Sequence, residues 1–458
     1  QVQNSDFKNK SAEMEADAPL IPSKHIIFVC NWERTDSINA VTKMIKESRS
    51  EISIWALIHD DKAESLLDYN IYDSVLDVRH ADVAVGEDIL STVTIREVLS
   101  RDRFLDDTSA NHILLQRQYK LISDWLAPVK NAILIGEVSW AIEELVLIYA
   151  RSRAWDYFTP SVSRSFDRRW FLANGMSEET MVSPLSEVLS DRVSQAILST
   201  RPQYYYQALY DLKFLNRLRS TSLKKLISYL KSRKRRDLFL SKVKKQLSWV
   251  LTVFMKNNLK SSKLENKKLA IFPMHVQPEA SVDYLAPNLR DQYKVIEKLV
   301  EILPEGYILA VKDHPGNIHE FSIMSKLKLI FNKNILYLKP SFNIAEHYSE
   351  INMGFAITGT LALQLAERGV PTFTLARIFF NEHALCNYLD LDACTTVQVG
   401  ENDFSEVILE EENIRVKAYV FKNSFEGFCF STEEHGFRDP LYITNLSYEL
   451  AHRASLRY

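Results

Sequence analysis

The sequence has few of the features that mark secreted or membrane-spanning proteins. Its four cysteines form no CxxC pair and are too sparse for a disulfide-rich scaffold, so we interpret each as a buried free thiol in a cytoplasmic protein. No apolar run reaches the roughly 18 residues that a membrane span requires. The most apolar stretch, residues 132–150, contains three glutamates. We therefore expect a protein that is soluble or attached to a membrane surface.

Internal repeats and low-complexity segments are also absent from the sequence. Residues 1–20 are polar and lack the apolar core of a signal peptide, which predicts a disordered arm. The first residue is Gln1 instead of methionine, so we expect a segment processed or excised from a longer chain. With 458 residues, the chain exceeds the size at which single cores stop growing, about 250–300 residues. Its hydrophobic content of 46% is enough to fill two domains.

Charge is distributed unevenly along the chain. The formal net charge is −3, but residues 213–268 contain 18 Lys and Arg and only two acids, a local net of +16. The remainder therefore sums to −19. Such a segregation of charge indicates an anionic partner for the basic segment without saying anything about its fold.

Short apolar runs alternate with amphipathic stretches in the first third of the chain. Apolar, β-rich runs occur at residues 24–30, 51–59, 74–82 and 131–137. Strands that alternate with helices are typical of a parallel sheet covered by helices on both faces. We predict a first Rossmann-like domain at residues 21–175.

The rest of the chain divides into a helical part and a second alternating part. Residues 176–265 have apolar side chains three or four apart, which predicts helices, and they include most of the basic segment. Residues 266–400 alternate again and predict a second Rossmann-like domain. Residues 401–458 are expected to pack back on the domains. The predicted fold is therefore α/β, with two Rossmann-like domains facing a cleft and a helical insertion between them.

Polar side chains follow three predicted strands of the second domain. Ligands of open parallel sheets bind outside the carboxyl ends of the strands, so these side chains are candidates for a common site. They are His275, Gln277, Glu279 and Asp283 after residues 268–274; Lys312, Asp313 and His314 after 307–311; and Thr358, Gly359 and Thr360 after 353–357. Lys312 and Asp313 face opposite ways on a strand. His275 alternates with the buried face, and we interpret it as structural.

The turn at residues 358–360 predicts an anion site. A strand that ends in Thr-Gly-Thr and opens directly into a helix leaves backbone N–H groups and the positive end of the helix dipole pointing outward, which suits a phosphate. An ordinary N-cap is the alternative interpretation. Lys312 and His314 beside a phosphate would neutralise the departing anion or give it a proton.

Three segments in this order, 277-QPEASVD-283, 311-VKDHP-315 and 357-ITGTLALQLAERGVP-371, resemble the capsule polysaccharide biosynthesis family of bacterial glycosyltransferases. The resemblance covers residues 268–376 and reaches the N-terminal half only through residues 135–144 and 155–171. It implies the two-Rossmann GT-B fold. It also implies transfer of β-Kdo from CMP-Kdo to a saccharide acceptor with retention, in the synthesis of capsule or O-antigen.

The resemblance also implies roles for individual residues. Asp283 is expected at the reacting carbon, His314 beside the phosphate or carboxylate of the donor, and Glu137 as the base that activates the acceptor hydroxyl. A carboxylate from each domain suits a retaining reaction, which needs a nucleophile and a base. Gln277 and Glu279 are expected to shape the donor pocket.

The nucleotide is expected at the Thr-Gly-Thr turn, where Thr358, Gly359 and Thr360 would hold the phosphate of CMP. The family usually carries Glu four residues beyond the second Thr, but this chain has Gln364, which can still bond a ribose hydroxyl. Lys312 is a candidate partner for the carboxylate of the sugar. No Asp-x-Asp pair stands where a nucleotide-sugar metal is expected, so we predict no metal and no cofactor.

The basic segment at residues 213–268 interleaves Lys and Arg with Leu, Ile, Trp and Phe. An amphipathic basic helix of this kind binds anionic membrane surfaces, which suits an enzyme working on a lipid-linked or oligosaccharide acceptor at the inner membrane. A solvated helix pair is the structural alternative, and nucleic acid is not expected as a partner. A transferase for another activated sugar, and a non-catalytic module that binds lipid-linked glycan, are the alternative functions.

Overall fold

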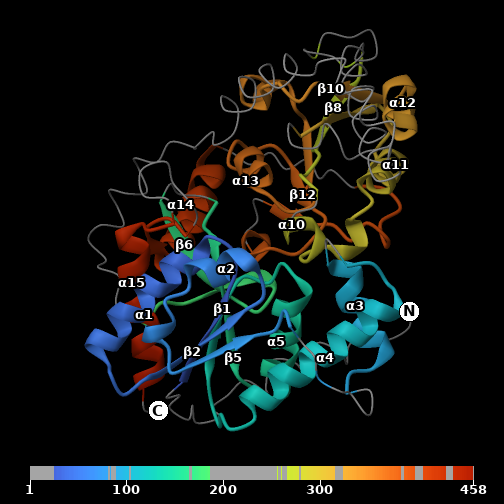
Figure 1. Ribbon diagram of the computed structural model, residues 1–458. Coiled ribbons are helices and arrows are strands. Elements are labelled where there is room, and N and C mark those ends of the chain that lie inside the picture. The colour runs from blue at the N-terminus through green and yellow to red at the C-terminus, as the bar shows by residue number, and fades with distance from the viewer. Residues whose placement is uncertain are drawn as a thin grey trace, which may run out of the picture.

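The computed structural model describes most of the chain outside the basic segment. The described residues are 25–80, 83, 89–102, 105–164, 168–185, 255, 259, 266–277, 280–314, 323–382, 386–397, 406–429 and 437–456. The predicted arm at residues 1–20 and Glu279 lie outside them, and so does nearly all of the basic segment. The chain forms two α/β domains, each built on one sheet (Figure 1).

The N-terminal domain contains an eight-stranded mixed sheet in the order β14-β6-β5-β4-β1-β2-β3, with β7 also paired to β6. Its strands are β1 (His25–Cys30), β2 (Ser53–Ile58), β3 (Ser74–Asp77), β4 (Ile133–Ile135), β5 (Asp156–Val162), β6 (Arg169–Asn174), β7 (Ser177–Val182) and β14 (Phe425–Glu426). Its helices are α1 (Arg34–Ser48), α2 (Asp61–Leu66), η1 (Tyr69–Ile71), α3 (Thr92–Arg101), α4 (Ser109–Leu126) and α5 (Ala141–Ser152). The four predicted strands, β1 to β4, are parallel as expected, and β5 adds a fifth parallel strand, whereas β6 runs antiparallel to β5, β7 and β14. Because β7 pairs with β6, this sheet extends past the predicted domain boundary at residue 175 and into the range predicted to be helical.

The C-terminal domain contains a six-stranded parallel sheet in the order β10-β9-β8-β11-β12-β13. Its strands are β8 (Lys268–Pro273), β9 (Tyr307–Lys312), β10 (Ile335–Leu338), β11 (Met353–Ala356), β12 (Thr372–Thr374) and β13 (Cys386–Tyr388). Its helices are α10 (Ala280–Asp283), η5 (Pro287–Leu289), α11 (Gln292–Ile302), α12 (Ile323–Phe331), η7 (Ile344–Glu350), α13 (Thr360–Ala366) and η8 (Phe379–Glu382). The order reverses between β8 and β11, and such reversals are where doubly wound sheets bind ligands.

The first strand is buried on both faces because helices cover both sides of the N-terminal sheet. Residues 26–30 are almost fully buried, and alternate side chains enter different cores. Ile27 and Val29 pack in the core with α3, α4 and α5, whereas Ile26 and Phe28 pack in the core with α1. A strand covered on both faces needs a continuous apolar sequence, which is the pattern of this run.

Side chains from both sheets join the two domains in a shared core. Phe171 of β6 meets Phe379 of η8 edge to face, with 5.4 Å between ring centroids, a geometry worth about 0.5–1.5 kcal/mol beyond the buried area. Val420 of α14 (Glu406–Lys422) and Leu363 of α13 belong to the same cluster. This shared core brings the antiparallel end of the first sheet against the C-terminal domain.

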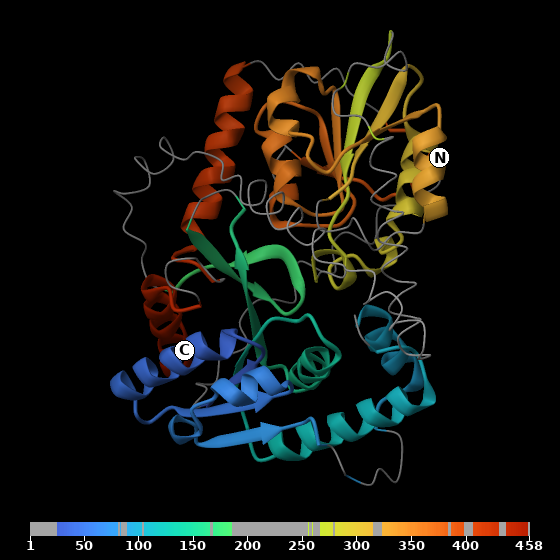
Figure 2. The ribbon, with the colours of Figure 1, turned by 45° about the horizontal axis from the view of Figure 1, so that its top comes forward.

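The last helix of the chain returns to the N-terminal domain. Helix α15 (Pro440–Ser455) lies beside α1, so the red end of the chain adjoins its blue beginning (Figure 2). Asp439 caps the helix by accepting a hydrogen bond from the Tyr442 N–H at 2.9 Å, and Pro440 occupies the first turn. Among the described residues, no helix combines the length and apolar character needed to cross a bilayer.

Candidate functional site

The carboxyl ends of β8 and β11 meet at the reversal of the C-terminal sheet. Gly359 follows β11 with φ +146°, and a Cβ at this position would lie 3.2 Å from Cε1 of His275, which follows β8. Glycine therefore permits both the backbone conformation and the close approach of the imidazole. Burial, and next the charge of Arg164, lower the pKa of His275 to about 3, so the ring is neutral at pH 7. Its position beside the predicted phosphate turn makes His275 part of this edge of the sheet.

A buried amide fixes the segment that follows β8. Gln292, at the start of α11, accepts from the His275 N–H at 2.8 Å and donates to the His275 carbonyl at 3.0 Å. The same Nε2 donates to Oε1 of Gln277 at 2.8 Å. Sequence reasoning missed Gln292 because it assigned the residue only to a helix. A glutamine in the apolar row of that helix is the signal that could have found it.

Asp283 lies at a joint between the domains. Its side chain is 1% exposed, and its Oδ1 accepts from Arg290 Nε at 2.9 Å. Arg290 Nη1 also donates to the carbonyl of Ser100 in α3 of the N-terminal domain. Tyr284, the next residue, packs in the core of that domain. The predicted reacting carboxylate is therefore held by an arginine that contacts both domains.

The end of β9 separates its side chains onto two faces. Asp313 turns into the core, where its Oδ2 lies 3.2 Å from Nζ of Lys326 and 3.1 Å from the hydroxyl of Tyr337. Burial lowers the pKa of Lys312 to about 8, against the raising effect of Asp313. Burial, and next the charge of Lys312, lower the pKa of His314 to about 4. A bound anion would reverse both shifts because it favours the charged forms.

The predicted nucleotide residues differ in exposure. Thr358 is fully buried, whereas Thr360 begins α13 at the surface. Gln364, one turn later, accepts from the hydroxyl of Tyr348 in η7 at 3.2 Å. The guanidinium of Arg368 lies over the ring of Tyr348, 4.1 Å from its centroid. The Gln364 side chain is therefore directed toward η7.

Glu137 lies at the carboxyl edge of the N-terminal sheet. It follows β4, and its Oε2 lies 2.8 Å from Nη1 of Arg34 in the first turn of α1. The two side chains are 25% and 18% exposed, so the pair is partly accessible to solvent. Gly136 lets the end of β4 lie close to β1, because a Cβ at residue 136 would lie 2.8 Å from Cβ of Val29. The reversal of this sheet, between β1 and β4, positions the pair.

Glu143 organises the same edge and was missed by sequence reasoning, which gave no role to this residue of the segment 135–144. The side chain is fully buried and accepts from the N–H of Trp140 at 3.0 Å and from Nδ2 of Asn31 at 2.6 Å. Its Oε1 also lies 3.4 Å from Nε2 of His59. One carboxylate thus ties together the segments that follow β1, β2 and β4. The signal in the sequence is an acid at the third position of a helix, where capping-box residues occur.

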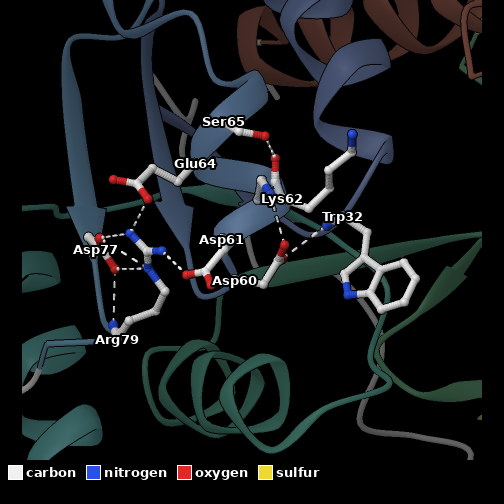
Figure 3. A network of polar contacts seen from close by, with 9 residues as sticks. Trp32, Asp60, Asp61, Lys62, Glu64, Ser65, Asp77 and Arg79 are labelled. Carbon is white, nitrogen blue, oxygen red and sulfur yellow. Dashed lines mark hydrogen bonds and ion pairs between the residues drawn. The ribbon is translucent and has the colours of Figure 1, made fainter.

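An exposed tryptophan stands at this edge. Asp60 accepts from the Trp32 N–H at 2.9 Å while it caps α2 through the Ala63 N–H at 2.8 Å (Figure 3). Trp32 has φ +45° and is 57% exposed, and its ring centroid lies 6.3 Å from that of Trp140. The neighbouring ion cluster around Arg79, also visible in Figure 3, fixes α2 against β3. The two indoles offer an apolar surface beside Glu137.

Within the described residues, no three His, Cys, Asp or Glu side chains gather closely enough to bind a metal ion. The arrangement provides cations and neutral imidazoles at the C-terminal sheet and carboxylates at the N-terminal sheet. Such a set can bind an anion and transfer protons.

No protein-family model matches this sequence, and no curated protein matches it. Among solved structures, the beta Kdo 2,7 transferase of Thermosulfurimonas dismutans KpsC is similar at 11% identity, with 80% of this chain and 97% of that chain covered and a TM-score of 0.34. The beta Kdo 2,4 transferase of the same protein is similar at 9% identity, with 71% and 88% covered and a TM-score of 0.35. Acinetobacter baumannii MurG is similar at 9% identity, with 88% and 94% covered and a TM-score of 0.25. At these values the likeness carries no argument about activity, and membership of the capsule polysaccharide family stays a prediction.

Proposed function

We propose that this chain is a retaining glycosyltransferase that transfers β-Kdo from CMP-Kdo to a saccharide acceptor in the synthesis of a cell-surface polysaccharide. The observation that supports this most is the convergence of three strand ends at the reversal of a doubly wound sheet. His275, Lys312 and Gly359 come from β8, β9 and β11, which are neighbours in the sheet although they are far apart in sequence. A phosphate-linked donor suits such an edge.

The donor binds with its phosphate at the turn of residues 358–360. Backbone N–H groups and the ammonium of Lys312 stabilise the charge that develops as the bond from sugar to phosphate breaks and CMP leaves. Lys312 is suited to this because burial lowers its pKa to about 8, so a bound phosphate gains by favouring its charged form. His314 is neutral at pH 7 and bonds the departing phosphate.

Two carboxylates serve the two halves of the reaction. Asp283 attacks the reacting carbon as CMP leaves, and the acceptor hydroxyl then displaces Asp283 while Glu137 takes its proton. Arg290 orients Asp283, and Arg34 orients Glu137. Double displacement gives retention at the anomeric carbon.

The acceptor lies on the N-terminal side in this proposal. Trp32 and Trp140 provide an apolar surface beside Glu137, and aromatic side chains with a few polar groups are the usual lining of small-molecule sites. The acceptor is a lipid-linked or free oligosaccharide. Contact of residues 213–268 with an anionic membrane remains part of the proposal, although these residues lie almost wholly outside the described part of the chain.

A transferase for a different activated sugar is the second candidate. The observation that favours it is Gln364, which stands where the family usually has Glu and which bonds Tyr348 through Oε1. The nucleotide is therefore tested first. Thermal-shift measurements with CMP, UDP and GDP are expected to show stabilisation by CMP; stabilisation by UDP and not by CMP would favour the second candidate.

Release of CMP from CMP-Kdo in the presence of a crude acceptor tests the catalytic assignments. We expect Asp283→Ala and His314→Ala to reduce the rate by a factor of 100 or more. His347→Ala is the matched control, because His347 pairs with Glu350 at the surface of the same domain. Equal rates in wild type and in both site variants would show that the catalytic assignment is wrong.

A further inference from the structure

Arg164 follows the carboxyl end of β5 in the N-terminal domain, and its charged side chain is mostly buried. It follows β5 in a left-handed conformation, φ +60°, and its side chain is only 8% exposed. Its Nη2 is paired with Oε2 of Glu178 on β7, and Oε1 of Glu178 accepts from the Ser161 hydroxyl at 2.9 Å. One side of the guanidinium is therefore fixed by the β-hairpin that carries it.

The other side of the guanidinium is the second terminal amino group, Nη1. Among the described residues, Nη1 of Arg164 is buried without a hydrogen-bond partner. An unsatisfied buried donor is costly, and more so on a charged group, so native proteins keep few of them. A buried donor with no partner among the described residues is well suited to a ligand that accepts hydrogen bonds.

The surroundings identify the chemistry of that ligand. The hairpin that carries Arg164 packs on the C-terminal domain, since β7 contacts η8 and Phe171 meets Phe379. The charge of Arg164 contributes to the lowered pKa of His275, which lies against Gly359 at the reversal of the sheet. His314 adds to the same lowering. The groups around this point are thus cationic or capable of becoming so, which calls for an anion.

Two described acids of this region have other partners. Glu178 pairs with Nη2 of Arg164 and accepts from Ser161, and Asp313, next to His314, points into the core toward Lys326. Among the described residues, neither carboxylate accepts a hydrogen bond from Nη1. This donor therefore favours an oxyanion supplied by a ligand.

We propose that Arg164 binds the carboxylate of the donor sugar. The inference rests on the proposed function and names the residue that selects an acidic sugar. In the proposed function the phosphate belongs to the turn of the C-terminal domain, whereas Arg164 belongs to the N-terminal domain, which is the acceptor side of that proposal. A planar guanidinium matches a carboxylate in geometry, so an arginine selects it better than a lysine would.

The test compares a donor that carries the carboxylate with a nucleotide that lacks it. Affinities for CMP-Kdo and for CMP are measured calorimetrically with wild type, Arg164→Gln and Arg164→Lys. We expect Arg164→Gln to weaken CMP-Kdo binding roughly 10- to 100-fold and to leave CMP binding within about twofold, as loss of one charge-assisted hydrogen bond predicts. Arg164→Lys should lie between the two because it keeps the charge without the fork.

Arg153→Gln is the matched control. Arg153 caps the C-terminus of α5 and lies over Trp155, 5.6 Å from the ring centroid, in the same domain. It should change neither affinity. A thermal scan of every variant verifies folding, so that a loss of binding by Arg164→Gln is read only from folded protein.

The outcomes separate this inference from the proposed function. If CMP and CMP-Kdo weaken together, Arg164 holds the phosphate and the inference is wrong. If neither changes, Arg164 is structural. If wild type binds UDP in place of CMP, the Kdo donor is wrong. The role of Arg164 is then tested by comparing the affinities of Arg164→Gln for UDP-glucuronate, which carries a carboxylate, and for UDP-glucose, which does not. Wild type that binds none of these nucleotides overturns both proposals.

Discussion

The buried ion pair behind the site gives a prediction whose size follows from the structure. The side chains of Asp313 and Lys326 are both 0% exposed, with 3.2 Å between Oδ2 and Nζ. Asp313→Asn leaves the Lys326 ammonium in the core without its carboxylate. Breaking a buried pair from one side costs about 3–5 kcal/mol, because the remaining charge is uncompensated. For a domain of this size each kcal/mol lowers the Tm by about 2–4 °C, so we expect a loss of about 6–20 °C.

Thermal unfolding followed by circular dichroism and calorimetry measures this effect. Glu350→Gln is the matched control, since it breaks the surface pair with His347, in which Glu350 is 53% exposed. A surface pair contributes about 0–1 kcal/mol, so the control should shift the Tm by no more than a few degrees. Equal shifts for the two variants would refute the reasoning about burial.

A double variant separates loss of the pair from loss of space. Asp313→Asn combined with Lys326→Met removes the stranded charge, and replacing both partners of a buried pair is often neutral or stabilising. We expect the double variant to recover most of the Tm lost by Asp313→Asn. Its donor affinity should recover only in part, because Asp313 both fixes the end of β9 and raises the pKa of Lys312.

Three further predictions concern the site itself. Since burial is the largest cause that lowers the pKa of His275 to about 3 and of His314 to about 4, the unfolded chain binds more protons below about pH 6.5, and stability falls as the pH decreases from there toward 4. Allowing for partial exposure, we expect the free energy of unfolding to fall by roughly 1–2 kcal/mol per imidazole between pH 7 and 5. Urea unfolding should show a smaller fall when both histidines are replaced by Asn. An unchanged fall would show that other groups cause the pH dependence. Gly359→Ala should weaken nucleotide binding about tenfold or more, because the added Cβ presses on the imidazole of His275. Gly306→Ala is the control: Gly306 has φ +85° and nothing within 4 Å of an added Cβ, so this change should lower protein stability without weakening nucleotide binding. Equal nucleotide affinities of the two variants in titrations would contradict the contact. Lys312→Met should lower donor affinity about tenfold. It should also abolish the fall in donor affinity above about pH 8 that deprotonation of a lysine with a pKa of about 8 causes. If the variant keeps this fall in affinity, another group causes it.

Strand positions could be predicted well from the sequence. Apolar runs at residues 268–274, 307–315 and 353–360 correspond to β8, β9 and β11, which end one, three and four residues earlier than these runs. The alternation of side chains likewise gave Asp313 a face opposite to Lys312. These features are local, because burial of a strand on both faces requires an apolar run wherever the strand lies. The strands β5, β6 and β7 were not predicted, since their sequences contain polar and aromatic residues without a clear period.

The sequence by itself determined the two α/β domains, the polar strand ends and the charge segregation. All three follow from the amino-acid composition of each segment and from the periodicity of its apolar residues. Only the tertiary structure decided which of these strand ends meet. Strand order depends on pairing between segments far apart in sequence, and it brings β8 beside β11, so that His275 packs on Gly359. The same long-range packing brings Arg164 close enough for its charge to lower the pKa of His275, and it ties Asp283 to Ser100 through Arg290. Such contacts have no periodic signal, because each depends on the docking of two surfaces that fold from separate parts of the chain.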